Sequence, residues 1–273
     1  MDNHVIDLDE DDDLIYIIYK NSKPYFSKIL SFSILLSYFL GIFCMDDKMN
    51  ELSPSIRNLY FRVIVKYPYC QDNRYQIWRF ITSSYVHLNL KHLIYNSILF
   101  FPLLYYFDIF YNIINIVLIL LSISFLSNLI FYYYQPYSTI IGCSHLVFGL
   151  FGALLGDYII NKKYRESFYF VQIFLSILVI FIDILVYFFD YHEDSGYIVH
   201  WGGYFVGFLS SLIFLPNIIS RKYNYKIGVI GYFFLFLLCF VLINNYIFNW
   251  PPKVENRCCY LFLTNQSVIN CIN

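Results

Sequence analysis

Long apolar runs separated by short polar segments dominate the chain. Seven of these runs have about the length needed to cross a bilayer, which takes ~17–25 residues. We place them at Ile29–Met45, Leu88–Phe107, Ile109–Tyr133, Ser144–Ile160, Phe168–Phe189, His200–Leu215 and Ile227–Phe248. Only the charge of Asp108 separates the second run from the third, but one helix over both would run far past the bilayer. The pattern therefore predicts an all-α polytopic membrane protein with a membrane domain over residues 29–248.

The composition agrees with a membrane protein. Hydrophobic residues make up 59% of the chain and charged residues 14%, whereas about a quarter of a soluble domain is charged. The formal net charge of -1 argues against nucleic acid as a partner. We therefore expect the lipid bilayer to be the main surrounding of this chain.

Basic residues predict the orientation in the membrane. They gather before the first run, between the fourth and fifth, and between the sixth and seventh, as Lys20, Lys23, Lys28, Lys162, Lys163, Arg165, Arg221, Lys222 and Lys226. With seven spans these regions share one side, which the positive-inside rule makes cytosolic. The long linker Asp46 to Trp78 is also basic and runs against this assignment. The acidic residues 1–28 are then expected to form a disordered cytosolic tail, and residues 249–273 a non-cytosolic tail.

The same topology divides the cysteines. Cys70, Cys258, Cys259 and Cys271 fall on the non-cytosolic side, where disulfides can form. Their pairing cannot be read from the sequence. No cysteine pair has zinc-like spacing with a nearby histidine, so we expect no metal site.

Polar residues lie at the beginning of the second, fourth and sixth runs, which all start on the same side of the membrane. These residues are His87, His92, Asn96, Ser144 and His200. Ser144 precedes Lys162 by nearly as many residues as His200 precedes Arg221, so both lie at similar depth near the outer boundary. His92 and Asn96 are four residues apart and share one helix face.

Glycines predict that the fourth and sixth runs touch. Gly149, Gly152 and Gly156 lie in one run, and Gly203 and Gly207 in the other. Small residues at such spacing let membrane helices approach closely. Close approach would carry the polar residues of these two runs toward each other.

This set of residues has the chemistry of acyl transfer. A serine hydroxyl needs a base to become a nucleophile, and His200 could supply it to Ser144. The Ser144 backbone N–H, His92 and the Asn96 amide are suitable donors to an oxyanion. Each residue taken singly is explained by packing, but polar groups at one depth on three membrane helices favour a functional site.

At these residues the chain resembles the rhomboid family of intramembrane serine proteases. Trp78 and Arg79, followed by His87, His92 and Asn96, resemble the family's WR and HxxxxHxxxN motifs. Gly142, Cys143 and Ser144 resemble its GxS motif. His200, Gly203 and Gly207 resemble its HxxGxxxG motif. The three motifs occur in order over about half of the chain.

The resemblance implies roles for these residues. Ser144 and His200 would form a catalytic dyad without a carboxylate, and His92, Asn96 and the Ser144 amide would form the oxyanion hole. Phe148 would pack against the catalytic histidine. The remaining motif residues would be supporting ones: His87, Trp78 and Arg79 in the first loop, Gly142 before the serine, and Gly203 and Gly207 between helices.

The resemblance also implies an architecture and a substrate class. It implies a six-helix bundle plus one C-terminal transmembrane helix, the eukaryotic form, which favours the secretory pathway or plasma membrane over mitochondria. The expected activity is a serine-type endopeptidase that cleaves transmembrane segments of single-pass membrane proteins. No cofactor is implied.

One residue departs from the family pattern. His145 follows Ser144, where the family usually has a small residue, and its bulky imidazole could crowd the site or perturb the dyad. An inactive rhomboid-like pseudoprotease that binds or escorts membrane clients is therefore the alternative. A transporter is a more distant alternative, because it would need discontinuous helices or paired charges at the membrane midplane, and Asp183 is the one residue that points to such a site.

Other polar residues of the runs receive structural interpretations. Asp183 could orient His200 as the acid of a triad does, but the family pattern needs no acid, so we expect a structural hydrogen bond. Asp157 is expected to face water or Lys162. Ser127 and Asn128 are expected to make contacts between helices.

Overall fold

The computed structural model describes most of the membrane domain. The described residues are 22–44, 63–64, 77–87, 89–134, 139–162, 166–189, 196–218, 222–248, 259–263 and 266–270. The acidic run near the N-terminus, most of the long linker and the side chains of Cys70, Cys258, Cys259 and Cys271 lie outside this part. The disulfides and, for residues 1–21, the disordered tail therefore stay predictions. The expected tail reached too far, because Tyr25 to Lys28 already belong to the first long helix.

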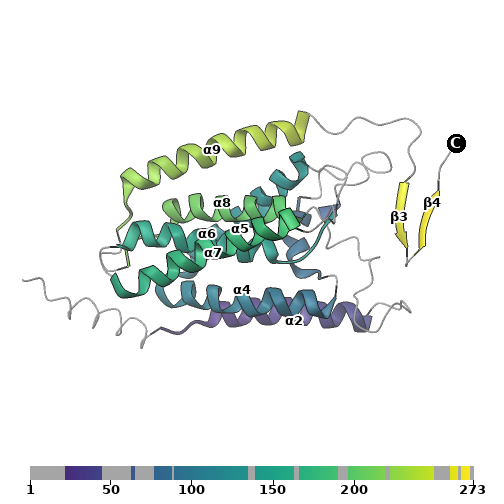
Figure 1. The fold of residues 1–273 in the computed structure, drawn as a ribbon, viewed down its shortest axis with the longest axis horizontal. Helices are drawn as coiled ribbons and strands as arrows, with labels where there is room; N and C mark the ends of the chain where they lie inside the picture. Colours follow the sequence, from purple (N-terminus) through teal and green to yellow (C-terminus); the bar gives the residue numbers. More distant parts are fainter. Residues whose placement is uncertain are drawn as a thin grey trace, which may run out of the picture.

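Seven long helices make up most of the described chain and lie roughly side by side (Figure 1). They are α2 (Tyr25–Cys44), α4 (Leu90–Phe110), α5 (Ile113–Tyr134), α6 (Ser144–Asn161), α7 (Glu166–Phe189), α8 (Gly196–Phe214) and α9 (Tyr225–Phe248). Within the described residues, α4 to α9 provide six stretches that are long and apolar enough to cross a membrane, and α2 adds a shorter apolar stretch at Tyr25–Leu40. The predicted all-helical polytopic fold is confirmed.

Short elements connect and extend the helices. The loop before α4 contains α3 (Arg79–Thr82) and the 3-10 helix η2 (Ser83–Tyr85). Strand β1 (Val63–Ile64) pairs antiparallel with β2 (Thr139–Ile140), just before α6. Strands β3 (Cys259–Leu263) and β4 (Gln266–Asn270) form an antiparallel pair near the C-terminus. The hydrophobic pattern predicted none of these strands, because they are too short to show an alternation.

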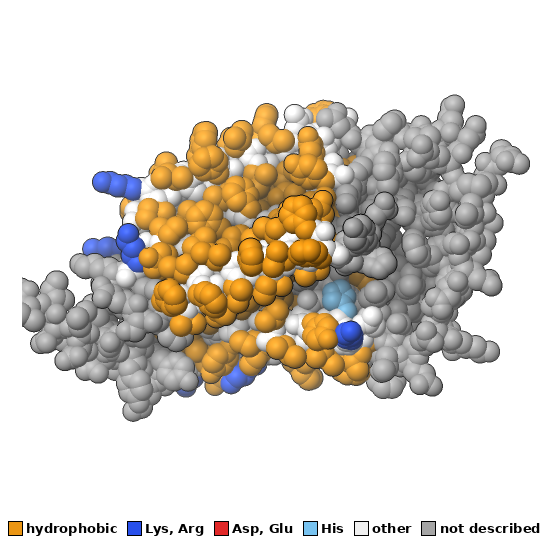
Figure 2. Space-filling model, viewed as in Figure 1, with side chains coloured by type: hydrophobic (Ala, Val, Ile, Leu, Met, Phe, Trp, Pro, Cys, Tyr) orange, Lys and Arg blue, Asp and Glu red, His pale blue; other side chains and the backbone are white. Residues whose placement is uncertain are grey.

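Hydrophobic side chains cover the described surface. Figure 2 shows them across the middle of one face, with most of the Lys and Arg side chains at the left-hand end. Large apolar side chains stay exposed along the outer helices, such as Phe170 on α7 and Phe236 on α9. An apolar belt of this kind suits lipid rather than water, because a soluble monomer rarely exposes a large contiguous apolar patch.

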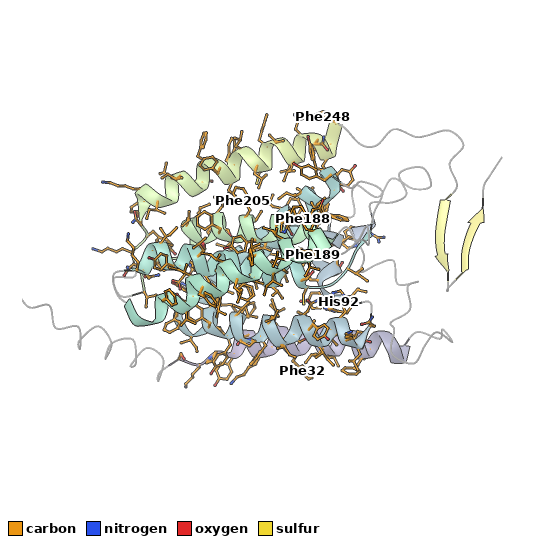
Figure 3. All side chains as sticks on the ribbon, in the orientation of Figure 1. Phe32, His92, Phe188, Phe189, Phe205 and Phe248 are labelled. Carbon is orange, nitrogen blue, oxygen red and sulfur yellow. The ribbon has the colours of Figure 1, made fainter. Side chains whose placement is uncertain are left out.

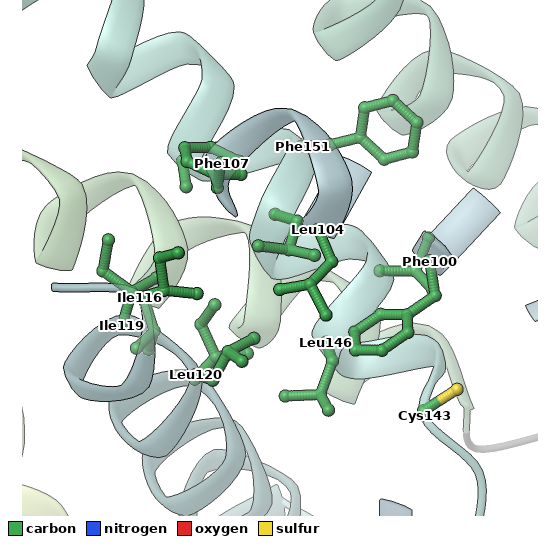
Figure 4. Close-up of a cluster of buried hydrophobic side chains, with 14 of the residues drawn as sticks. Phe100, Leu104, Phe107, Ile116, Ile119, Leu120, Cys143, Leu146 and Phe151 are labelled. Atoms are coloured by element: carbon green, nitrogen blue, oxygen red, sulfur yellow. The ribbon is translucent and has the colours of Figure 1, made fainter. Parts of the chain in front are cut away.

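Packing among α4, α5 and α6 forms the core (Figure 4). Its fully buried side chains include Phe100 and Leu104 of α4, Ile116 and Ile119 of α5, and Leu150 of α6. These side chains all belong to one buried hydrophobic cluster. The core thereby fixes α6, which begins at Ser144, against α4, which carries His92 and Asn96.

Helices α6 and α8 run parallel and make the most extensive helix contact in the structure. A side chain on Gly207 would strike the carbonyl of Gly149, and one on Gly203 would strike the carbonyl of His145. In the reverse direction, a side chain on Gly152 would strike the carbonyl of Tyr204. The helix contact that the glycine spacing predicted is therefore present, with backbone against backbone.

The break between α4 and α5 lies later than predicted. Asp108 remains inside α4, where its carboxylate accepts hydrogen bonds from the backbone N–H and the hydroxyl of Ser27, both at 2.9 Å. The helix ends instead at Phe110, and the Asn112 side chain accepts from the N–H of Asn115 at 3.0 Å near the start of α5. The break was predicted at Asp108 because the sequence alone does not show that this carboxylate has a hydrogen-bonding partner on α2.

The expectation that Asp157 faces water or Lys162 was wrong. The residue is fully buried. Its carboxylate accepts hydrogen bonds from the hydroxyls of Tyr106 and Tyr111 and, at 2.7 Å, from the Asn161 amide. Enough polar partners surround it to replace water, which is how a buried carboxylate is tolerated.

The two polar residues predicted to join helices behave differently. The Asn128 amide donates to the Phe80 carbonyl of α3 at 2.8 Å, as predicted. The Ser127 hydroxyl instead donates to the Ile123 carbonyl in its own helix at 2.6 Å, so for Ser127 the prediction was wrong. Its neighbour Ser124 makes the contact to Phe80, at 2.7 Å.

Candidate active site

The candidate site lies at one end of the bundle, where α4, α6 and α8 begin and α7 ends. Figure 3 places His92 at the same end as Phe188 and Phe189, the last residues of α7. The parity of the spans predicted that the starts of these three helices would share one side. The structure brings their polar residues together there.

Ser144 and His200 are in direct contact. Ser144 is the first residue of α6, and His200 lies one turn inside α8, which begins four residues earlier than predicted. The Ser144 Oγ and His200 Nε2 atoms are 3.0 Å apart, a hydrogen-bond distance. On the other side of the ring, His200 Nδ1 is 3.0 Å from Asp183 Oδ1 on α7. The hydroxyl, the imidazole and the carboxylate thus form one continuous chain of contacts.

An aromatic ring fixes the plane of the His200 imidazole. Phe148, one turn after Ser144, stacks on it with ring centroids 4.2 Å apart and an angle of 6° between the planes. Such a stack holds the ring by dispersion while leaving both ring nitrogens free for hydrogen bonds. The His200 side chain keeps 19% of its surface exposed, so the site is not sealed.

A tight turn before α6 brings in the residues of α4. Gly142 has a φ of 104°, a conformation that side chains other than hydrogen rarely adopt. A Cβ at this position would lie 2.8 Å from His92 Cε1 and 3.5 Å from Asn96 Nδ2. The turn therefore passes directly against both α4 residues, two positions before Ser144.

The Asn96 amide nitrogen is a buried donor. It has no hydrogen-bond partner among the described residues. A buried unpaired donor is costly, and this one lies beside the Gly142 turn, two positions before Ser144. The N-terminus of α6 adds backbone N–H groups without partners inside the helix.

His87 contacts the residue that follows Gly142 in the same turn. Its Nε2 atom lies 3.4 Å from both the backbone nitrogen and the Sγ atom of Cys143. Burial lowers the pKa of His87 to about 3, and the neighbouring His92 contributes in the same direction. Burial also raises the pKa of the Cys143 thiol to about 12. Near neutral pH this pair is therefore uncharged, and Cys143 is not a competing thiolate.

His145 does not point at the Ser144–His200 contact. Its side chain is buried, and its Nε2 atom lies 3.1 Å from the hydroxyl of Ser84 in η2. A second contact joins η2 to the turn before α6, because the Ser83 carbonyl accepts a hydrogen bond from the N–H of Gly142 at 3.0 Å. The helix η2 ends at Tyr85, and the chain then continues to His87. The hydrogen-bond contact of the His145 ring is thus with a hydroxyl of η2 rather than with Ser144 or His200. An effect of this ring on the Ser144–His200 pair stays a prediction.

Comparison with known protein families gives a match. The model of the Rhomboid domain family matches residues 74–217, which is more than half of the 273 residues. The chain belongs to the rhomboid family. No curated protein matches it.

Every predicted site residue lies inside the matched rhomboid domain. Trp78 and Arg79 lie at the start of α3, and α3 leads directly into η2. Arg79 is buried and Trp78 is about half exposed. Of the described residues, no group of three or more His, Cys, Asp or Glu side chains is placed to hold a metal ion.

Sequence reasoning missed two contributors to the rhomboid site. Ser84 gave no signal, because it lies in a short polar segment outside the family motifs. Asp183 did give one, since a carboxylate inside an apolar span is rare. It was assigned a structural role because the family pattern needs no acid.

Proposed function

We propose that the protein is an intramembrane serine endopeptidase that cleaves transmembrane segments of single-pass membrane proteins. The observation that carries this proposal is the 3.0 Å contact between Ser144 Oγ and His200 Nε2 at the beginning of two tightly packed helices. Membership in the rhomboid family, generally one of intramembrane serine proteases, supports it.

In the proposed reaction, His200 Nε2 takes the proton of the Ser144 hydroxyl as its oxygen attacks the scissile carbonyl carbon. The tetrahedral intermediate collapses when the carbon–nitrogen bond breaks, and His200 returns the proton to the leaving amine. Water then attacks the acyl-enzyme with the same histidine as base, which releases the carboxylate product and restores the serine. The part of the His200 side chain that stays exposed leaves the ring accessible to this water.

The negative oxygen of the intermediate needs donors that are already in place. The Asn96 amide nitrogen suits this role, because it is buried and has no partner among the described residues. The N–H of Ser144 at the helix start and the His92 ring beside Gly142 are the other donors of this proposed oxyanion hole. The positive end of the α6 dipole adds to the same field.

The domain boundaries follow from this proposal. The proposed membrane domain that carries the activity runs from the start of α2 at Tyr25 to the end of α9 at Phe248, with the acidic tail before it on the cytosolic side and residues 249–273 on the other. We keep the secretory pathway or the plasma membrane as the proposed location.

A serine-reactive fluorophosphonate probe tests the proposal on the full chain in detergent or liposomes. Wild-type protein should become labelled, and Ser144→Ala should not. Ser122→Ala is the matched control, because the hydroxyl of this half-buried serine donates to the Leu118 carbonyl of its own helix. It should label like wild type.

Two results would count against the proposal. Labelling that persists in Ser144→Ala contradicts the nucleophile assignment. A folded protein that neither labels nor cleaves a test transmembrane substrate would instead favour the pseudoprotease that binds membrane clients.

A further inference from the structure

Helix α7 has one polar stripe on an otherwise apolar surface. Gln172, Ser176 and Asp183 lie along it at helical spacing, and all three are buried. Neighbouring α7 side chains such as Phe181 and Ile182 stay about half exposed. The stripe is therefore the face that α7 turns toward the rest of the bundle.

Each residue of the stripe contacts a different part of the bundle. The Gln172 amide donates to the Tyr106 hydroxyl of α4 at 2.6 Å. Ser176 donates to the Phe151 carbonyl of α6 at 2.7 Å and lies 2.8 Å from the Tyr204 hydroxyl of α8. Asp183 makes the last contact, to His200. The first two contacts already attach α7, so attachment alone does not explain a carboxylate at the third position.

The surroundings of Asp183 differ from those of the structural carboxylate Asp157. Both oxygens of Asp157 accept hydrogen bonds, from Tyr106, Tyr111 and Asn161. Asp183 Oδ1 faces His200 Nδ1, whereas its buried Oδ2 has no partner in the described part of the chain. A carboxylate inside a membrane span is costly, and its one contact here is the ring that also contacts Ser144.

The geometry also concerns the tautomer of His200. To accept the Ser144 proton, Nε2 must carry a lone pair, so the single proton of the neutral ring must sit on Nδ1. Asp183 is the acceptor that Nδ1 meets among the described residues. An ionised carboxylate accepts hydrogen bonds but cannot donate them, so Asp183 favours the neutral tautomer with the proton on Nδ1. The same negative charge stabilises the imidazolium cation that forms during proton transfer.

We propose that Asp183 is a positioning residue for His200, so that the chain works as a Ser144–His200–Asp183 relay rather than as a two-residue dyad. This inference rests on the proposed protease function. Asp183 touches neither substrate nor nucleophile, and it acts through the orientation and tautomer of the imidazole.

Asp183→Asn tests this on the full chain, because it keeps the shape of the side chain and removes the charge. The rate constant kcat for a test transmembrane substrate should fall about 10- to 100-fold, because a positioning residue accounts for less than the roughly 10²- to 10⁴-fold that the general base itself contributes. The KM and the thermal midpoint should stay near their wild-type values, because no substrate contact and little volume are lost. Ser176→Ala is the matched control on the same stripe and should leave kcat within about two-fold.

A second measurement reads the tautomer without any activity. In ¹⁵N-histidine-labelled protein, the His200 signals, assigned by their absence in His200→Gln, should show a protonated Nδ1 and an unprotonated Nε2. Asp183→Asn should alter this pattern, and Ser176→Ala should preserve it.

The two measurements separate the two proposals. If wild type is inactive but shows the Nδ1–H tautomer and Asp183→Asn loses it, the protease proposal fails and the positioning role stands. If Asp183→Asn keeps its kcat within two-fold, or if wild-type His200 carries its proton on Nε2, the relay is wrong.

Discussion

Gly207 lies where α8 presses against α6, and an added methyl group there has no room. The Cβ of an alanine would meet the Gly149 carbonyl oxygen, with the carbonyl carbon at 2.6 Å and the Cα at 2.8 Å. These are backbone atoms, so no rotamer change can relieve the clash. Carbon atoms pack at about 3.5–4.0 Å, so the two helices must separate by about 1 Å at this level.

Such a shift reaches the candidate site directly. Ser144 and His200 lie on the same two helices, one to two turns away, and their contact of 3.0 Å would lengthen to about 4 Å, beyond hydrogen-bond range. A misplacement of this size can cost about 100-fold in rate. The expected result for Gly207→Ala is therefore a fall of roughly that size in fluorophosphonate labelling.

Stability gives an independent reading of the same clash. Gly→Ala inside a helix gains about 1 kcal/mol of helix propensity, whereas overpacking costs about 1–3 kcal/mol. A backbone clash belongs at the upper end, so Gly207→Ala should lose about 1–2 kcal/mol. Gly228→Ala on α9 is the control, because its Cβ would sit at 3.6 Å from the Leu212 carbonyl, an ordinary contact. It should be neutral or gain up to about 1 kcal/mol.

Labelling kinetics and thermal unfolding in one detergent measure both effects. The reasoning fails if Gly207→Ala labels and melts like wild type, because the helices would then absorb the methyl group without moving the site. It also fails if Gly228→Ala is as damaging as Gly207→Ala, because the loss would then reflect any added methyl group.

Two further predictions concern the supports of the site. Burial lowers the pKa of His87 to about 3, against about 6.5 when unfolded, so its contribution to stability is complete above pH 6.5 and is lost as the pH falls toward 3. Between pH 7.5 and 5, wild type should lose about 2 kcal/mol more free energy of unfolding than His87→Gln; equal losses in denaturant titrations at the two pH values would contradict this. Asp157→Ala should cost about 2–5 kcal/mol, because it removes the acceptor of the buried Tyr111 hydroxyl and of the half-buried Tyr106 hydroxyl. Its folded fraction should still label at the wild-type rate, since the site lies about 20 Å away along α6; a specific loss of labelling would refute that separation.

The positions of the membrane helices were predictable from the sequence because only long apolar runs can span a bilayer. The beginning of α6 at Ser144 was predicted correctly, since the turn residues before Ser144 separate its apolar run from the preceding one. The beginning of α8 was placed too late, at His200 instead of Gly196. A polar residue was taken as the helix end, although a neighbouring helix supplied its partner.

The rotation of each helix about its axis was harder to predict. In a soluble protein the apolar face is the inner face, but lipid makes the outer face of α7 apolar as well. Its polar stripe was the remaining signal, and Asp183 was assigned without Gln172 and Ser176 beside it. The three residues together indicate which face turns inward and hence that Asp183 reaches α8.

The partners of buried polar groups were the least predictable part. Asp108, Asp157 and His145 all find partners far along the chain, on α2, on α4 or in η2. Such pairs depend on the relative depth and rotation of two helices, which a single sequence does not fix. The motif residues could be predicted because the residue types, spacing and order of the motifs can be read directly from the sequence.

The helices of this bundle are not equally coupled to lipid. Of their apolar stretches, 67% is buried in α6 and only 17% in α7 and 11% in α9. A thinner or thicker bilayer tilts exposed helices at a cost of only fractions of a kcal/mol per Å, so it acts on α7 well before it disturbs the glycine contact of α6 and α8. The Ser144–His200 contact thus lies between the tightly packed helices α6 and α8, whereas the Asp183–His200 contact depends on α7, which moves more easily. The composition of the surrounding membrane bears on the second contact more than on the first.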